Sequence, residues 1–338
     1  MDVELLRRRA RLFWRIRDFF DGRDYLEVDT PLLAPDLIPE SCLEVFETSR
    51  IVPAGPGGSL RSRPYWLIPS PEIWMKKLIA KDRRNIYQIC KCFRNSESSG
   101  FLHSPEFTML EYYTMDAGYL DSLTITEELF TALAGIFQEE PAVCQQAEEL
   151  RPPFIRITME EAFERWAGFD LYGAAESGGL EAEARRLGID PPPGLGTGAL
   201  YDLIFVHAVE PNLPRDRPAV IMDYPAFVPC LAQKGRDGRT MERWELYVRG
   251  IELANCYSEE TDAEKVRAYF DAEGKIKEAE ALVPHRFDGD YWKTFLPDVC
   301  GRSFPSCSGV AMGLDRLIMV LSGKSAIDGI LPFPMQEL

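Results

Sequence analysis

Two segments of alternating hydrophobicity constrain the fold of this chain most strongly. The sequences NIYQICKCF (85–93) and EFTMLEYYTM (106–115) alternate in the way that is typical of β-strands. The loop between them, residues 95–104, contains the Ser and Gly residues that favour turns. The sequence therefore predicts a β-hairpin, and the runs AVIMDYP (219–225) and ERWELYVRGIELANCY (242–257) predict further strands.

Helical periodicity is distributed irregularly among these strands. The segment PAGPGGSLRSRP (53–64) is predicted to be a loop, and a last helix follows the Gly-rich run GVAMG (309–313). No regular βαβ alternation appears, which favours an antiparallel sheet covered by helices, in an α+β or mixed α/β domain. The other predicted helices cover about residues 3–21, 71–81, 119–138, 158–167, 175–187, 199–210 and 262–282.

Composition restricts the location and the partners of the protein. Lys and Arg number 38 against 54 Asp and Glu, a net charge of −16, so the chain lacks the overall basic footprint of a nucleic-acid binder, although a local basic patch stays open. No apolar run reaches the roughly 18 residues of a membrane span. The N-terminus resembles no signal peptide, so we expect a cytoplasmic protein whose eight cysteines are reduced. Cys90 and Cys92 share a strand face, but no second such pair completes a metal site.

The predicted hairpin carries residues suited to an anionic, aromatic ligand. Arg94, at a strand end, presents a permanently charged planar fork that fits phosphate or carboxylate. His103 and Phe107 follow on the returning strand, where the Phe107 ring offers a flat face to a base. The alternative is an ordinary structural hairpin.

Two carboxylates in the run WELYVRGIELANCYSEE are candidates for a metal site. Glu245 and Glu252 are seven residues apart, so they would face opposite sides of one straight strand. A bend at Arg249-Gly250 would bring them together, and paired carboxylates beside phosphate oxygens are a usual way to hold Mg²⁺. A solvated strand face is the alternative.

Two charged residues stand at predicted helix starts. Glu72 would interact with the helix dipole or receive a ligand ammonium group. Arg316, in the first turn of the last helix, opposes the dipole unless it holds an anion. Gly309 and Gly313, just before it, permit close backbone approach.

Taken together, these segments resemble the three signature motifs of class II aminoacyl-tRNA synthetases. EVDTP (27–31) resembles motif 1, CFRNSESSGFLHSPEFTMLEYY (92–113) motif 2, and GVAMGLDRLIM (309–319) motif 3. The resemblance covers about residues 5–325, and the runs SPEIWMKKLI, HSPEFTMLEYY and GIELANCYSEETDA are similar to the lysine branch. It implies one catalytic domain over residues 1–338, with a six- or seven-stranded antiparallel sheet flanked by helices, dimeric through motif 1.

The resemblance also implies roles for matching positions. Arg94 and Arg316 would be catalytic, with Arg94 bridging the substrate carboxylate and the α-phosphate of ATP. Glu245 and Glu252 would hold Mg²⁺. The implied ATP-binding residues are Arg94, Glu97, His103, Phe107, Glu245, Glu252, Gly313 and Arg316. The implied amino-acid-binding residues are Glu72, Glu111, Tyr113, Asn255, Glu259 and Ala311.

The acids of that pocket favour a cationic substrate, lysine or (R)-β-lysine, activated as its adenylate. Motif 1 arrives too early for the N-terminal anticodon-binding barrel of lysyl-tRNA synthetases, and Ala311 stands where those enzymes have Gly. Both departures, with the acidic charge, make tRNA an unexpected acceptor. They match stand-alone paralogues that ligate β-lysine to a lysine of translation elongation factor P.

Other features leave alternatives open. The motif 2 loop is one residue longer than usual, with Ser96 in the place of an acid and Glu97 shifted, and Ser104 stands where relatives often carry Asn. The alternatives are lysyl-tRNA synthetase activity, a truncated synthetase acting on another amine acceptor, or a non-catalytic regulatory paralogue.

Overall fold

The computed structural model describes residues 3–53, 60–95, 101–134 and 149–334. The chain forms two compact units. Unit 1 comprises Met1–Asp116, Glu260–Cys307 and Ala311–Leu338, and unit 2 comprises Ala117–Glu259 and Ser308–Val310. The expectation of one catalytic domain stays a prediction.

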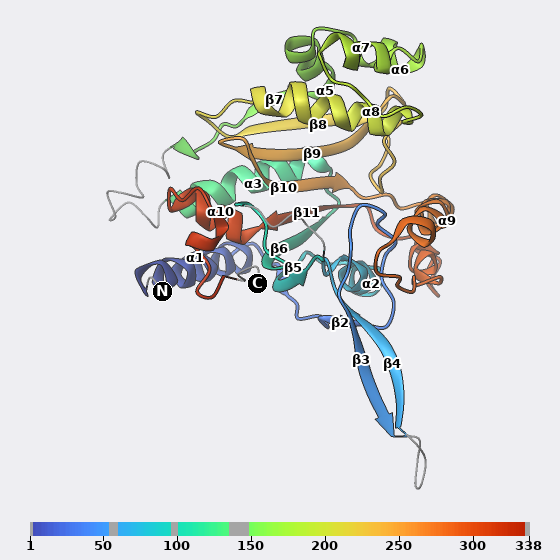
Figure 1. Ribbon diagram of the computed structural model, residues 1–338. Coiled ribbons are helices and arrows are strands. Elements are labelled where there is room, and N and C mark those ends of the chain that lie inside the picture. The colour runs from blue at the N-terminus through green and yellow to red at the C-terminus, as the bar shows by residue number, and fades with distance from the viewer. Residues whose placement is uncertain (1–2, 54–59, 96–100, 135–148, 335–338) are drawn as a thin grey trace. The chain divides into compact units, whose positions relative to one another are not determined.

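The strands pair into two sheets (Figure 1). Their bounds are β1 Leu26–Glu27, β2 Leu33–Ala34, β3 Glu47–Pro53, β4 Leu60–Leu67, β5 Ile86–Phe93, β6 Glu106–Met115, β7 Ile155–Thr158, β8 Ala219–Pro225, β9 Thr240–Val248, β10 Ile251–Ser258 and β11 Cys307–Gly313. The larger sheet has eight strands in the order β1-β5-β6-β11-β10-β9-β8-β7, and the smaller has the order β2-β4-β3.

Helices are interspersed among the strands, as the sequence predicts. In unit 1 they are α1 Val3–Asp21, α2 Glu72–Asp82, α9 Ala263–Glu280 and α10 Leu314–Leu321, with 3₁₀ turns at Tyr291–Phe295 and Ile327–Gly329. In unit 2 they are α3 Tyr119–Ala134, α5 Met159–Ala162, α6 Leu171–Glu176, α7 Leu180–Arg186 and α8 Thr197–Ile204, with π-helical turns at Phe163–Ala167 and Phe205–Val209 and a 3₁₀ turn at Glu210–Asn212. None of the helices within the described residues is long and apolar enough to cross a membrane.

The α+β class is confirmed, but the main sheet has eight strands rather than six or seven. It is also mixed, because β1 runs parallel to β5 and β7 parallel to β8. The edge strand β1 lies within YLEVDTP (25–31), for which the sequence predicts a short strand, whereas β7 has only four residues, too few for alternation to be recognised. The loop predicted at 53–64 is wrong at Pro53, which ends β3, and from Leu60 onward, where β4 begins. Residues 54–59 lie outside the described residues.

Three predicted helices differ in detail. The helix predicted at 175–187 is divided into α6 and α7, because Gly178 adopts a φ of 73° that ends a right-handed helix. The helices predicted at 158–167 and 199–210 both widen into π-helical turns after their first α-helical turns.

In unit 1, helix α1 packs on one face of the β5–β6 hairpin. Phe20 of α1 stacks on Tyr87 of β5 with ring centroids 4.9 Å apart, and it also contacts Tyr112 of β6. Tyr87 and Tyr112 are cross-strand partners, so they present one continuous aromatic surface to the helix. Phe107 and Glu111, whose side chains alternate with Tyr112 along β6, lie on the opposite face of the hairpin.

A buried ion pair joins α1 to the start of α10. The guanidinium of Arg9 donates to the Asp315 carboxylate, and it also donates to Thr108 Oγ1 at 2.7 Å. The second oxygen of Asp315 accepts from the backbone N–H of Thr108 at 2.6 Å. The Asp315 side chain is only 2% exposed, so its charge depends on these partners.

We therefore expect Arg9→Ala to lower the free energy of unfolding by about 3 kcal/mol, because it leaves a buried carboxylate without its cation. Urea denaturation followed by fluorescence would measure the change. Arg7→Ala is the matched control, since the Arg7–Glu4 pair is exposed and is worth about 0.5 kcal/mol or less. Equal losses in both variants would contradict the assigned role of Arg9.

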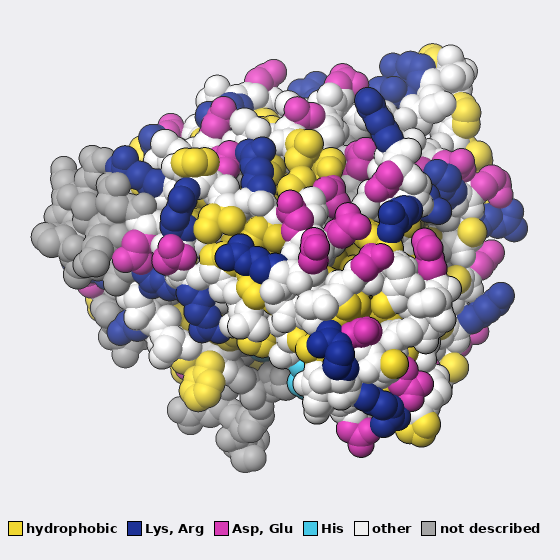
Figure 2. All heavy atoms as spheres, turned by 90° about the horizontal axis from the view of Figure 1, so that it is seen from above, with side chains coloured by type: hydrophobic (Ala, Val, Ile, Leu, Met, Phe, Trp, Pro, Cys, Tyr) yellow, Lys and Arg dark blue, Asp and Glu magenta, His cyan; other side chains and the backbone are white. Residues whose placement is uncertain are grey.

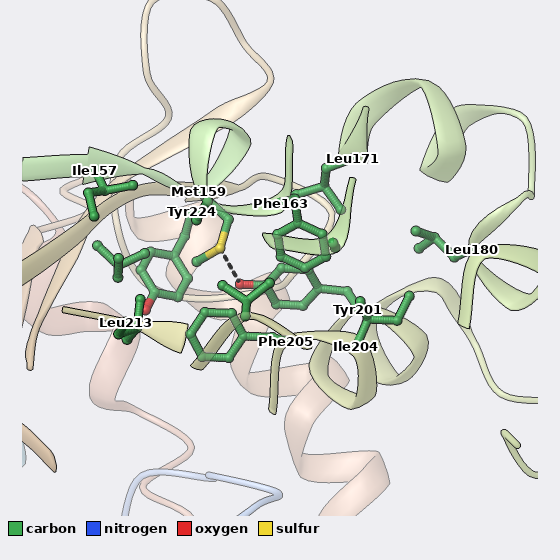
Figure 3. Close-up of a cluster of buried hydrophobic side chains, with 14 of the residues drawn as sticks. Ile157, Met159, Phe163, Leu171, Leu180, Tyr201, Ile204, Phe205, Leu213 and Tyr224 are labelled. Atoms are coloured by element: carbon green, nitrogen blue, oxygen red, sulfur yellow. Dashed lines mark hydrogen bonds between the residues drawn. The ribbon is translucent and has the colours of Figure 1, made fainter. Parts of the chain in front are cut away.

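The core of unit 2 is an aromatic and aliphatic cluster between its helices and its strands (Figure 3). Phe163 stacks on Tyr201 with ring centroids 5.4 Å apart, and the Tyr201 hydroxyl contacts Met159 Sδ at 3.4 Å. Ile221 and Tyr247 supply the strand side of this core. It anchors α5, α6 and α8 to the strands.

Candidate functional site

The face of the β5–β6 hairpin opposite α1 carries three of the predicted residues. Phe107, Glu111 and Tyr113 are separated by even numbers of residues on β6, so their side chains share one face. The register pairs Phe107 with Cys92 and Glu111 with Gln88. The hairpin predicted from the sequence is confirmed, and it places these three side chains on one face.

Arg94 lies beside Phe107. Its guanidinium carbon is 5.2 Å from the centre of the Phe107 ring, and its backbone N–H donates to Pro105 O at 3.0 Å. The hairpin thus brings together a permanent cation and an aromatic ring that are well separated in the sequence. A planar base and a phosphate are the kind of ligand that such a pair can bind.

Arg316 and His103 form a second cationic and aromatic pair. Arg316 Nη2 lies 2.8 Å from His103 Nε2, and Arg316 Nε donates to Leu102 O at 3.2 Å. A guanidinium can only donate, so Nε2 accepts and this contact needs its unprotonated form. Arg316 is in the first turn of α10, whose N-cap is Gly313, and Ala311 lies two residues earlier on β11. The predicted residues of motifs 2 and 3 in unit 1 therefore lie in contact.

Glu111 is a buried acid without a cationic hydrogen-bond partner among the described residues. It is 3% exposed, and one oxygen accepts from the Tyr113 hydroxyl at 2.6 Å. The other oxygen, Oε2, has no hydrogen-bond partner within the described part of the chain. Burial, followed by the charge of Glu72, raises the pKa of Glu111 well above its ordinary value. A ligand cation placed here would favour the ionised form.

Glu72, the first residue of α2, already has a partner. Its Oε1 accepts from Lys76 Nζ at 2.5 Å, and Lys76 is buried. The Glu-to-Lys spacing of four on one helix was the available sequence signal for this pair, which was not predicted. A second residue that was not predicted is Glu40, half-buried near Glu72. Burial and then the Glu72 charge raise the pKa of Glu40 to about 7.

In unit 2, the two predicted metal carboxylates lie on one face of the β9–β10 hairpin. Arg249 and Gly250 form its two-residue turn, with φ of 54° and 77°, as a type I′ turn requires. Glu252 is opposite Tyr247, and Tyr247 shares a face with Glu245 two residues earlier. The predicted bend at Arg249-Gly250 is confirmed, and it removes the conflict of the seven-residue spacing.

A β-bulge places Asn255 on the same face. The register shifts between Glu252 and Ala254, so that Leu253 is an extra residue and Asn255 pairs with Glu245. The face thus carries two carboxylates and an amide from two adjacent strands. Glu259 follows at the end of β10, where it is 3% exposed and its backbone oxygen accepts from Gln233 Nε2 at 2.9 Å.

Glu245 also has protein partners that were not predicted. Arg243 Nη2 donates to its Oε1 at 2.5 Å and the Tyr247 hydroxyl to its Oε2 at 2.8 Å. Arg243, Glu245 and Tyr247 are spaced by two on a predicted strand, and this spacing was the available signal. These contacts hold the Glu245 carboxylate in a fixed orientation.

The donor set on this face fits magnesium. Two carboxylates suit Mg²⁺, which prefers oxygen ligands and usually takes its remaining ones from water and substrate phosphate. Within the described residues, no three His, Cys, Asp or Glu side chains converge to hold a metal without substrate. Cys90 and Cys92 are free thiols with sulfur atoms 3.8 Å apart. Glu97 and Ser96 lie outside the described residues.

Comparisons with known proteins place these features in a family. The family model described as tRNA synthetases class II (D, K and N) matches residues 3–337. A protein from Avibacterium paragallinarum is 34% identical over 99% of this chain and 96% of its own length. A protein from Photobacterium profundum is 35% identical over 98% of this chain and 96% of its own length. A protein from Proteus mirabilis is 34% identical over 98% of this chain and 94% of its own length. All three relatives are named elongation factor P–(R)-β-lysine ligase.

Proposed function

Because the chain belongs to the class II tRNA synthetase family of the D, K and N type, we propose that it is an ATP-dependent ligase. Its substrate is (R)-β-lysine or lysine, and its acceptor is a lysine side chain of translation elongation factor P. Three relatives that carry the name of such a ligase match nearly the whole chain and support this choice. The observation that supports the choice of substrate is Glu111, a buried carboxyl whose Oε2 has no hydrogen-bond partner among the described residues and would pair with a ligand ammonium group.

The proposed reaction has two steps. In the first, an oxygen of the amino-acid carboxylate attacks the α-phosphorus of ATP, the bond to the bridging β-phosphate oxygen breaks, and pyrophosphate leaves. In the second, the acceptor amine attacks the carbonyl carbon, AMP leaves with the C–O bond electrons, and the amine loses a proton. Neither step needs a protein nucleophile, since positioning and charge neutralisation can lower both barriers.

ATP would be held mainly by cations and aromatic rings of unit 1. Arg94 would neutralise the α-phosphate and the attacking carboxylate, with Phe107 against the adenine. His103 and Arg316 would take the γ-phosphate, and Arg316 would cover the other adenine face. Gly313 gives the phosphates close access to backbone at the start of α10, and Glu97 completes the proposed ATP-binding set.

Magnesium would be held by Glu245 and Glu252. When bound, it would neutralise charge on the phosphate oxygens during attack. The residues themselves supply two anionic oxygens from one face of a hairpin, and Arg243 and Tyr247 orient the first of them. The remaining proposed residues bind the amino acid: Glu72, Glu111, Tyr113, Asn255, Glu259 and Ala311.

Pyrophosphate exchange tests the enzyme itself. We expect exchange of labelled pyrophosphate into ATP that depends on β-lysine or lysine, and little exchange with leucine or aspartate. A neutral side chain leaves the buried acid unpaired, a situation that can reject a substrate by about 10⁴-fold. Absence of exchange with every amino acid tested would contradict the proposal and favour a regulatory paralogue.

Transfer of labelled amino acid then identifies the acceptor. We expect the label on elongation factor P. Label on tRNA alone would favour lysyl-tRNA synthetase activity, which agrees with the description of the family as tRNA synthetases. The net charge of −16 disfavours tRNA as the acceptor, because a protein that binds nucleic acid usually has a basic surface. The face shown in Figure 2 carries both acidic and basic side chains. A cytoplasmic location and a homodimer belong to the same proposal, and sedimentation velocity would test the dimer.

A further inference from the structure

Unit 2 contains a pocket that the proposed reaction does not use. It has a volume of about 500 Å³, within the range of small-molecule sites. It is lined from the starts of α3 and α5, from α6, and from the end of β8 and the start of β9, all within unit 2. The proposed substrate and metal residues are absent from its lining.

The pocket is acidic. Glu160, Asp223, Asp237 and Glu242 line it, against one basic lining residue, Arg236. Among the described residues, none of these four carboxylates takes part in an ion pair. Asp237 accepts hydrogen bonds from the Thr240 hydroxyl and from the backbone N–H groups of Thr240 and Arg239, and these bonds outweigh burial and lower its pKa. Asp223, in contrast, is affected by the charges of its acidic neighbours.

Asp223 shows the effect of these neighbouring charges. It stands where β8 and β9 shift register, with a φ of 60° that is uncommon outside glycine. Burial raises the pKa of the Asp223 carboxyl, the hydrogen bond from the Tyr119 hydroxyl at 2.7 Å opposes the rise, and Asp237 and Glu242 add to it. A cation in the pocket would relieve this repulsion.

Tyr172 is the independent observation that points to a ligand. The residue lines the pocket and is 5% exposed, and its hydroxyl has no hydrogen-bond partner within the described part of the chain. Its ring is covered by the Arg239 guanidinium at 4.2 Å. Burial and then the charges of Glu160 and Asp237 raise the pKa of Tyr172 to about 12. Leaving a buried hydroxyl without a partner costs free energy that a ligand group would recover.

The arrangement of the acids decides the kind of cation. A metal ion needs several oxygens converging at one point, and no three carboxylates do so in the described residues, which include all four pocket acids. Acids spread around a pocket of this volume, with tyrosine rings in its wall, suit an extended organic cation. We propose that this pocket binds an alkylammonium group, carried by a free amine or by a lysine side chain of another protein.

Calorimetric titration of the whole protein with pentane-1,5-diamine tests the proposal. We expect saturable binding that weakens about tenfold or more in the Glu160→Gln/Glu242→Gln double variant, because two attractive charges are lost. Tyr172→Phe should weaken binding by a smaller factor. Absence of saturable binding to the unmodified protein, for the diamine and for a capped Gly-Lys-Gly peptide alike, would overturn the proposal. Binding of the peptide as well as the diamine would support a protein lysine as the source, and binding of the diamine alone a free amine.

Matched controls separate binding in this pocket from binding elsewhere on the protein and from a general loss of structure. Glu164→Gln removes one exposed charge from the next turn of the same helical segment, outside the pocket, and should leave binding unchanged. Tyr224→Phe removes another buried hydroxyl without a partner among the described residues, from the core rather than the pocket. Equal weakening in these controls would overturn the proposal. So would weakening in Glu259→Gln with none in the double variant, because the amine would then occupy the proposed amino-acid site. Competition by equimolar Ca²⁺ would favour a metal and also overturn it.

Discussion

Replacing Arg94 by alanine is expected to abolish adenylate formation, with pyrophosphate exchange reduced by about 10³-fold or more. The guanidinium is the permanent cation assigned to the attacking carboxylate and the α-phosphate, and it lies against the Phe107 ring. Alanine removes the counter-ion of both groups in the step where their negative charges must approach each other. Steady-state exchange at saturating ATP and amino acid would measure the loss.

Two further variants make this result specific. Arg94→Lys keeps the charge but loses the planar fork, so it should recover only part of the activity. Arg61→Ala, which replaces an exposed arginine on β4, should leave exchange unchanged. If Arg94→Ala kept near-normal exchange while remaining folded by circular dichroism, the assignment of the phosphate site would be wrong.

Replacing Glu252 by glutamine should reduce exchange by about 10²-fold or more, because a neutral amide is a poor ligand for Mg²⁺. The change keeps the size of a side chain on the β9–β10 face while removing its charge. Exchange measured against Mg²⁺ concentration is the informative assay, since the half-saturating concentration should rise as well. Glu164→Gln is the control for loss of one charge in the same unit. Unchanged activity with an unchanged Mg²⁺ requirement would exclude Glu252 as a ligand.

Much of this architecture could be predicted because it depends on local patterns. Hydrophobic and polar residues alternate in segments 86–93 and 106–115, and this alternation predicts the hairpin. Phe107, Glu111 and Tyr113 are separated by even numbers of residues, so they lie on one face of the strand. Glycine after arginine at 249–250 gives the second turn, since a type I′ turn needs positive φ. Short edge strands such as β7 escape prediction because four residues hold too little pattern.

The local partners of the predicted site residues were harder to find. Glu72 was assigned from its place at a helix start, but the structure pairs it with Lys76. Glu245 was assigned as a metal ligand, and the structure adds Arg243 beside it. Glu40 comes from a segment with no regular pattern, and its proximity to Glu72 depends on tertiary folding. A motif identifies which residues carry the chemistry, whereas packing decides which charges surround them.

The extra residue at Leu253 has a consequence for how this segment can change. Glu252 and Asn255 are an odd number of positions apart, and they share a face only because the bulge absorbs one residue. Regular pairing of all four residues from Glu252 to Asn255 would turn one of these two side chains to the opposite side of the sheet. Substitutions that retain the bulge are compatible with this geometry, whereas a change that straightens the strand at unchanged length is not. In β10 the irregular pairing is therefore as much a determinant of the site as the identity of the residues.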